Sequence, residues 1–154
     1  MDYYVQEIDA LQRWIYKAAT LTSMRLQEAP PSVPRPIILW EMPQRSRMKN
    51  LNQYTYVVRV RQYGKLFVSS FDQAAIFQDK LLNDLEEKYG VLPVYESGQA
   101  TALEVAKLKQ VDITFNNSES LDIPLVVTYE ITYGRTRPAA APAAATVKTT
   151  LTTT

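Results

Sequence analysis

The chain has 154 residues and a net charge of +1 at neutral pH, and it contains neither cysteine nor histidine. This excludes disulfides, thiolate catalysis and any site that uses histidine as a general base or zinc ligand, so we expect a protein that is not an enzyme and needs no cofactor or metal. The acidic, amphipathic first residues do not fit a signal peptide, and no apolar stretch approaches the ~20 residues that cross a bilayer, so we expect no membrane partner.

The first segment predicts a long amphipathic helix from Asp2 to about Gln27. Asp2 is placed to cap its start, and Pro30 and Pro31 are placed to end it. Apolar residues recur every three or four positions, as one face of a helix requires. They are Val5, Ile8, Leu11, Ile15, Ala18 and Leu21.

The segment from Pro30 to Asn50 fits neither a helix nor a buried loop. It contains five prolines, a short apolar run and a basic end. A connection of this length inside a domain is usually disordered or functional, and the large apolar side chains argue against disorder. We therefore expect an extended arm that leaves the domain body and packs on another molecule. Its candidate contact residues are Ile37, Ile38, Leu39, Trp40, Met42, Arg45, Arg47 and Lys49.

The small net charge hides an uneven distribution along the chain. Residues 30–50 carry a net charge of +3 and residues 135–154 carry another +3, which leaves −5 on the rest of the chain. Basic appendages on an acidic body favour contact between copies of the same protein, because complementary patches orient association. The alternative is that the surface charges are scattered by chance. Nucleic-acid binding is less favoured, because a nucleic-acid-binding protein would have a basic body.

The next segment predicts a β-hairpin. Tyr54 to Tyr63 is rich in β-branched and aromatic residues, Tyr63 and Gly64 supply a turn signal, and Lys65 to Val68 forms a shorter returning strand. The interleaved tyrosines and arginines of the first strand leave three interpretations open: ordinary sheet packing, a protein interface, or a stacking platform for single-stranded nucleic acid. The residues concerned are Tyr54, Tyr56, Arg59, Arg61 and Tyr63.

A second helix is predicted from Ser70 to Tyr89. Ser70 and Gln73 form a capping box, and Gly90 is placed to end the helix in a left-handed conformation. One apolar stripe is expected to face the core: Ala74, Phe77, Leu81, Leu82, Leu85 and Tyr89. The acidic residues near its end are interpreted as a solvated face rather than a metal site; they are Asp84, Glu86 and Glu87.

The remaining sequence predicts a loop, a second hairpin and a tail. Residues 91–101 are loop-like, and strand patterns over 105–115 and 123–133 flank the polar turn 116–120. After Gly134 the composition is dominated by Ala, Pro and Thr, which cannot bury enough apolar surface to order itself, although Thr146 to Thr154 could add to a neighbour's sheet edge. We expect one α+β domain over residues 1–135, with the arm over 30–50, and a C-terminal tail over 136–154.

This α+β order resembles the tail-completion or tail-terminator proteins of long-tailed bacteriophages. The expected fold is a small mixed sheet of two β-hairpins packed with two helices. The resemblance covers roughly Met1 to Arg135 and rests on the capped helix from Ser70 to Tyr89 between two hairpins and on the final strand IPLVVTYEITYGR. These motifs are similar to the family pattern, whereas the Pro-rich arm and the Ala/Thr tail exceed it.

The resemblance implies a structural virion protein that forms a ring, expected to be a hexamer, at the end of the tail tube. Such a ring stops tube growth and joins the tail to the head connector. The implied partners are other copies of the chain, the tail tube protein and the connector or neck protein, with DNA only passing through the ring lumen. The implied location is the virion tail or neck, and the host cytoplasm during assembly.

On this interpretation the arm anchors on the next subunit, while Tyr54, Tyr56, Arg59 and Arg61 are candidates for tube or neighbour contacts. Two alternatives remain at this point: another structural protein of the neck or connector, and a nucleic-acid-binding module that uses the Tyr/Arg strand.

Overall fold

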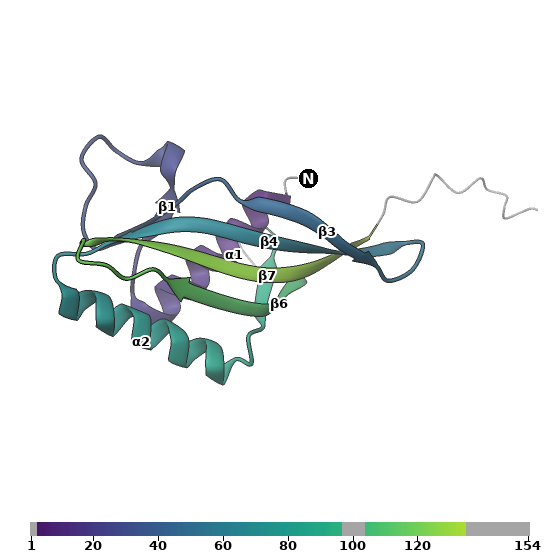
Figure 1. Cartoon of the computed structure of the whole chain (residues 1–154). Helices are drawn as coiled ribbons and strands as arrows, with labels where there is room; N and C mark the ends of the chain where they lie inside the picture. Colours follow the sequence, from purple (N-terminus) through teal and green to yellow (C-terminus); the bar gives the residue numbers. More distant parts are fainter. Residues whose placement is uncertain (1–2, 97–103, 135–154) are drawn as a thin grey trace, which may run out of the picture.

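The computed structural model describes residues 3–96 and 104–134, which form two α-helices and a seven-stranded mixed sheet (Figure 1). The helices are α1 (Tyr3–Ala19) and α2 (Phe71–Glu87), and η1 (Leu26–Glu28) is a short 3-10 turn. The strands are β1 (Ser23–Arg25), β2 (Ile37–Trp40), β3 (Gln44–Asn50), β4 (Thr55–Phe67), β5 (Leu92–Tyr95), β6 (Glu104–Phe115) and β7 (Asp122–Gly134). The expected α+β class is confirmed.

The strand order is β1-β2-β4-β7-β6-β5, and β3 pairs with the same edge of β4 as β2 does, further along the strand. The β1–β2 pair is parallel, and the other pairs are antiparallel. Both helices contribute to one core on one face of the sheet, and Figure 1 shows α1 behind the strands and α2 along their lower border. The opposite face of β4, β7 and β6, which points toward the viewer in Figure 1, carries no helix among the described residues.

Alternation along the two longest strands decides which side chains enter the core. In β7 the odd-numbered residues from Ile123 to Tyr133 are buried, while in β4 the even-numbered residues from Val58 to Leu66 are buried. These side chains pack against Leu11 and Ile15 of α1 and Leu81 of α2, all of which are fully buried. One face of the sheet is therefore apolar and the other polar.

The predicted turn at Tyr63 and Gly64 is wrong, because β4 runs through both residues and pairs with β7 along its whole length. Gly64 instead makes room for the neighbouring strand. A Cβ atom at this position would lie 2.9 Å from the Leu39 carbonyl oxygen and 2.9 Å from Cε3 of Trp40. The glycine therefore marks a close approach of β2 rather than a turn.

The first helix is shorter than predicted, because α1 ends at Ala19 rather than near Gln27. Thr20 adopts a positive φ of 53°, which turns the chain so that Leu21 is fully buried and β1 can join the sheet. The apolar periodicity of a helix continues through Leu21 in the sequence, but Ser23–Arg25 instead form β1, which pairs with β2. The proposed cap, Asp2, lies outside the described residues.

The predicted Ser70 cap of α2 is confirmed, but the reciprocal bond of a capping box is displaced by one residue, from the Ser70 amide to the Ser69 amide. The Gln73 amide donates to Ser70 Oγ over 3.1 Å, while the Gln73 side chain accepts from the Ser69 amide over 2.8 Å. Gly90 has the expected positive φ, 67°. The predicted stripe is only partly buried, because Leu82 is half-exposed and Tyr89 lies past the helix end and is almost fully exposed.

The expectation that residues 30–50 leave the domain body is wrong. Ile37, Ile38, Leu39 and Trp40 form β2 inside the sheet and are at most 3% exposed. Arg35 holds the Pro-rich part to the body, since its guanidinium donates to the Val68 carbonyl over 2.8 Å and to Asp122 over 2.7 Å. Burial of four large apolar side chains in the chain's own core outweighs any role for them as an anchor on a neighbour.

The second hairpin is confirmed as β6 and β7. The expected loop over 91–101 contains a strand, β5, which pairs with the first half of β6. The expected tail, 136–154, lies outside the described residues. Neither helix in the described ranges is long and apolar enough to span a bilayer.

Candidate interaction surfaces

The β3–β4 hairpin is the part of residues 30–50 that remains available for contact. Every residue of β3 is exposed, and Figure 1 shows the hairpin projecting beyond the rest of the sheet, on the side away from α2. Residues 44–55 contain three cations and no acid. At the tip, Asn52 Oδ1 accepts from the amides of Tyr54 and Thr55 over 2.7 and 3.0 Å, which fixes the turn.

A buried carboxylate fastens this hairpin to the body. Glu7 of α1 is fully buried, and it accepts two hydrogen bonds from the Arg45 guanidinium, at 2.6 and 3.1 Å. The same carboxylate accepts hydrogen bonds from the hydroxyls of Tyr129, at 2.7 Å, and Tyr133 of β7. The Glu7 cluster, which consists of Glu7, Arg45, Tyr129 and Tyr133, therefore joins α1, β3 and β7. Arg45 was a candidate for contact with another copy of the chain, and it instead meets an acid of its own chain.

Electrostatics reinforce the Glu7 cluster. Burial, followed by the charge and hydrogen bonds of Glu7, raises the pKa of Tyr129 and Tyr133 above the ordinary value of 10.0. Burial alone would lower the pKa of Arg45, but the hydrogen bonds and charge of Glu7 raise it above its ordinary value. The protonated tyrosines and the charged guanidinium therefore compensate for the buried carboxylate.

Arg47 and Lys49 of β3 form no ion pair with another described residue. Met48 between them is 42% exposed, and Leu51 at the tip is 52% exposed. Met42, in the connection before β3, is also exposed. The strand register places Arg47 on the face toward the helices and Lys49 on the opposite face. Both faces of the hairpin therefore present a cation without an ion-pair partner among the described residues, near large apolar side chains, as protein contact surfaces often do.

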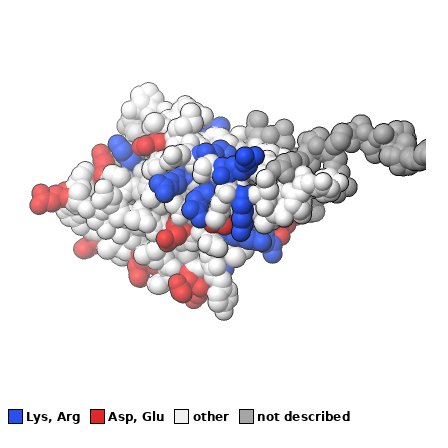
Figure 2. Space-filling view, turned by 45° about the vertical axis from the view of Figure 1, so that its right-hand side comes forward, with Lys and Arg blue, Asp and Glu red and all other residues white. Residues whose placement is uncertain are grey.

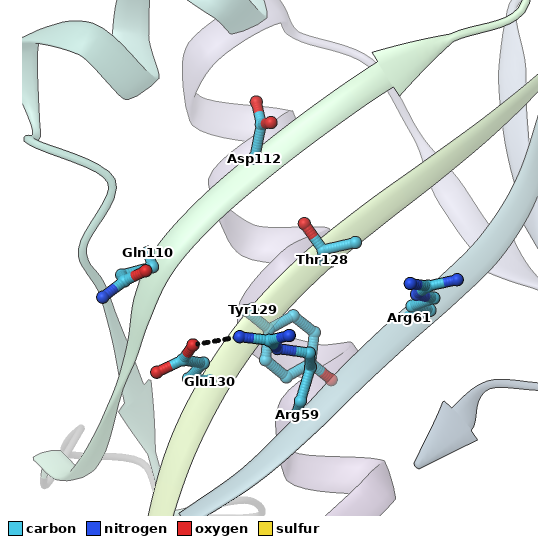
Figure 3. Close-up of a pocket in the computed structure, with 7 residues that line it drawn as sticks. All are labelled: Arg59, Arg61, Gln110, Asp112, Thr128, Tyr129 and Glu130. Carbon is cyan, nitrogen blue, oxygen red and sulfur yellow. Dashed lines mark hydrogen bonds and ion pairs between the residues drawn. The ribbon is translucent and has the colours of Figure 1, made fainter. Parts of the chain in front are cut away.

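The second surface is the uncovered face of the sheet. Arg59 and Arg61 point away from the helices, beside a hollow of about 370 Å³ between β4, β7 and β6 (Figure 3). Arg59 pairs with Glu130 across the strands at 3.0 Å, and Asp112 of β6 lies on the same face. Arg61 has no ion-pair partner among the described residues.

Cations outnumber acids on this uncovered face. Among the described residues, strand register and alternation place six exposed cations on it, against the four acids Glu104, Asp112, Asp122 and Glu130. Figure 2 shows Lys and Arg side chains gathered over one region of the surface, with most acidic side chains toward its border. The cations are Lys49, Arg59, Arg61, Lys65, Lys107 and Lys109.

The tyrosines and arginines of β4 do not form one platform. Tyr56 lies on the face that the helices cover, where its ring stands 6.3 Å from that of Tyr133, while Arg59 and Arg61 lie on the opposite face. Successive side chains of a strand point to opposite faces, so residues of different parity separate. Tyr54 stands outside the strand at the hairpin tip.

A third surface is the outer side of α2, which we call the acidic stripe. Asp72, Ile76, Asp79 and Glu86 are spaced by four, three and seven residues, so they share one helix face, opposite to the buried Ala74, Leu81 and Leu85. None of these three acids forms an ion pair with a described residue. Ile76 is 54% exposed.

Sequence reasoning treated α2's acids as solvated and missed both the acidic stripe and the Glu7 cluster. One signal for Glu7 was present, because it lies four residues before Leu11 on the apolar face of the helix. In the described ranges, no group of three acidic side chains is placed to hold a metal ion. No family model and no curated protein matches the chain.

Proposed function

We propose that this chain is a structural subunit that assembles with copies of itself into a ring at the end of a bacteriophage tail tube. The ring would stop tube growth and connect the tail to the neck. The proposal rests on the resemblance described above, in which a capped helix lies between strands and a long strand closes the domain. The α+β architecture is compatible with this resemblance.

The single observation that carries the proposal is the exposed β3–β4 hairpin, with exposed apolar side chains, an anchored base and two cations that form no ion pair with a described residue. Met48 and Leu51 expose apolar surface on the same hairpin as Arg47 and Lys49. A subunit contact would bury the apolar side chains and pair the cations. The Glu7 cluster holds the hairpin before association, which lowers the entropy lost on binding.

Native mass spectrometry and negative-stain electron microscopy test this proposal. The purified chain, alone or mixed with tail tubes formed by the tube protein of the same phage, should form closed rings of one stoichiometry, and the rings should cap tube ends. A protein that stays monomeric at its highest soluble concentration and leaves the tubes uncapped would refute the proposal.

A second candidate function is binding of nucleic acid by the uncovered sheet face, favoured by the excess of cations there. Because lysines and arginines that bind phosphates release counterions, affinity for an oligonucleotide should fall steeply with salt. Arg61→Gln should weaken binding and reduce the salt slope by about one, whereas Lys80→Gln on α2 should leave both unchanged. Affinity that does not depend on salt or on Arg61 would exclude this candidate.

A further inference from the structure

We propose that the β3–β4 hairpin of one copy docks on the acidic stripe of α2 in the next copy, so that the chain associates head to tail. This inference rests on the proposed ring function and names the two surfaces that would form the subunit contact. The occupant of the acidic stripe is a second copy of this chain.

Charge complementarity is the first argument. The hairpin offers Arg47 and Lys49 without a partner among the described residues, and the acidic stripe offers Asp72, Asp79 and Glu86 in the same condition. Opposite charges on two surfaces of one molecule attract copies to each other and orient them. A symmetric contact of hairpin on hairpin would instead bring like charges together.

The apolar side chains also match. Met48 and Leu51 protrude from the hairpin, and Ile76 and Leu82 are exposed on α2. Near the end of α2 a hollow of about 340 Å³ is lined by Leu82 and Leu85 together with the acids Glu86 and Asp112. Met48 of a second copy could therefore contact the leucines of this hollow while the neighbouring Lys49 pairs with one of its carboxylates.

The arrangement in the fold makes the contact intermolecular. Figure 1 shows the hairpin projecting from one end of the sheet, while α2 runs along the border of the body away from the hairpin tip. The turn at Asn52 and the Arg45 hydrogen bonds to Glu7 hold the hairpin in this direction, so it does not fold back on its own helix. Two different patches that join successive copies form a heterologous interface, which produces a ring when the rotation closes.

Charge reversal provides the main test. We expect Arg47→Glu with Lys49→Glu on the hairpin, or Asp79→Lys with Glu86→Lys on α2, each to abolish rings in native mass spectrometry. An equimolar mixture of the two variants should restore rings of alternating copies, and a single chain with all four changes should assemble by itself. Lys65→Glu is the matched control, because Lys65 lies opposite Leu39 of β2, at the other end of β4 from the hairpin, and it should assemble like the unchanged chain.

Cysteine pairs provide an independent test, because the chain has no cysteine of its own. An oxidised mixture of the single variants Leu51→Cys and Ile76→Cys should yield a disulfide-linked dimer, since a disulfide requires Cα atoms within roughly 7 Å. To allow for a shifted register, Met48→Cys with Leu82→Cys is tested in parallel. Cross-linking of Leu51→Cys with itself, and none in either mixture, would show a hairpin-to-hairpin contact and overturn the inference.

The outcomes separate this inference from the proposed function. If the unchanged chain forms rings that cap tubes, and both charge-reversed variants assemble as well as it does, the docking inference fails while the ring function stands. If the unchanged chain forms no rings and caps no tubes, the proposed function fails, and the docking inference fails with it. Loss in each variant and recovery in the mixture would support both.

Discussion

Replacement of the buried Glu7 carboxylate should cost much of the stability of this fold. Glu7 is fully buried and accepts hydrogen bonds from Arg45, Tyr129 and Tyr133. Glu7→Gln keeps the size of the side chain but removes its charge, so the guanidinium loses its counter-ion, and two donors, one from Arg45 and one tyrosine hydroxyl, face the new amide nitrogen. Breaking a buried ion pair costs about 3 to 5 kcal/mol, and because the Arg45 side chain is 30% exposed and keeps access to water, we expect about 3 kcal/mol.

Urea denaturation followed by circular dichroism measures this loss, and a double-mutant cycle with Arg45→Met separates the ion pair from the rest. If the pair is coupled, the two substitutions together should cost about 1 to 3 kcal/mol less than the sum of their separate effects. Lys88→Met, which removes the ion pair of a 45% exposed lysine side chain with Asp84 at the end of α2, is the control and should cost at most about 1 kcal/mol. A loss below about 1 kcal/mol for Glu7→Gln, with additive effects in the cycle, would refute the role of the Glu7 cluster.

Three further predictions concern pH, the close approach of β2, and the link between the helices. Because folding raises the pKa of Tyr129 and Tyr133, these tyrosines lose their protons at lower pH in the unfolded chain than in the folded one. The free energy of unfolding should therefore be constant below about pH 10 and then fall by up to about 2.7 kcal/mol per pH unit. Urea midpoints measured across this pH range test the prediction. A stability that is flat through pH 11, about one unit above the ordinary tyrosine pKa, would contradict this. Gly64→Ala should destabilise the fold by about 1 to 3 kcal/mol, since its Cβ would lie 2.9 Å from Leu39 and Trp40, and an unchanged thermal midpoint would be inconsistent with this packing. Trp14→Phe, which removes the 2.7 Å hydrogen bond from the indole to Asp84, should cost about 1 to 2 kcal/mol in urea denaturation, and a neutral effect would show that this link contributes nothing.

The parts of the fold that follow from local chemistry were predictable. The Ser70 cap of α2, the left-handed Gly90 and the alternation of β7 are set by residues close together in the sequence. At each of these places the local conformational preference of the residues agrees with the tertiary structure. The second hairpin was predictable for the same reason, because β6 and β7 are adjacent in the chain and separated by a polar turn.

The errors came from contacts between distant segments. Gly64 resembles a turn residue until Trp40, from a strand far earlier in the chain, is placed over it. The apolar run of β2 resembled an exposed anchor because nothing local shows which sheet edge it joins. The α1 helix stops at Ala19 because the sheet needs β1, although the helical pattern continues.

For the candidate site, Arg47 and Lys49 at the basic end of the predicted arm are exposed on β3, and their role in a subunit contact stays a prediction. The attachment of this end was not foreseen. Arg45 turns to the buried Glu7, one of the acids that contribute to the net charge of −5 on the rest of the chain. A buried ion pair depends on two segments meeting, and composition does not reveal it.

The most direct test of the account is the mass of the assembled particle, measured for the unchanged chain, for each charge-reversed variant and for their equimolar mixture. We expect one closed oligomer for the unchanged chain, monomers for each variant alone, and an oligomer of the same copy number for the mixture. Monomers in all four samples, with tube ends left uncapped, would contradict the central claim that this chain builds a ring.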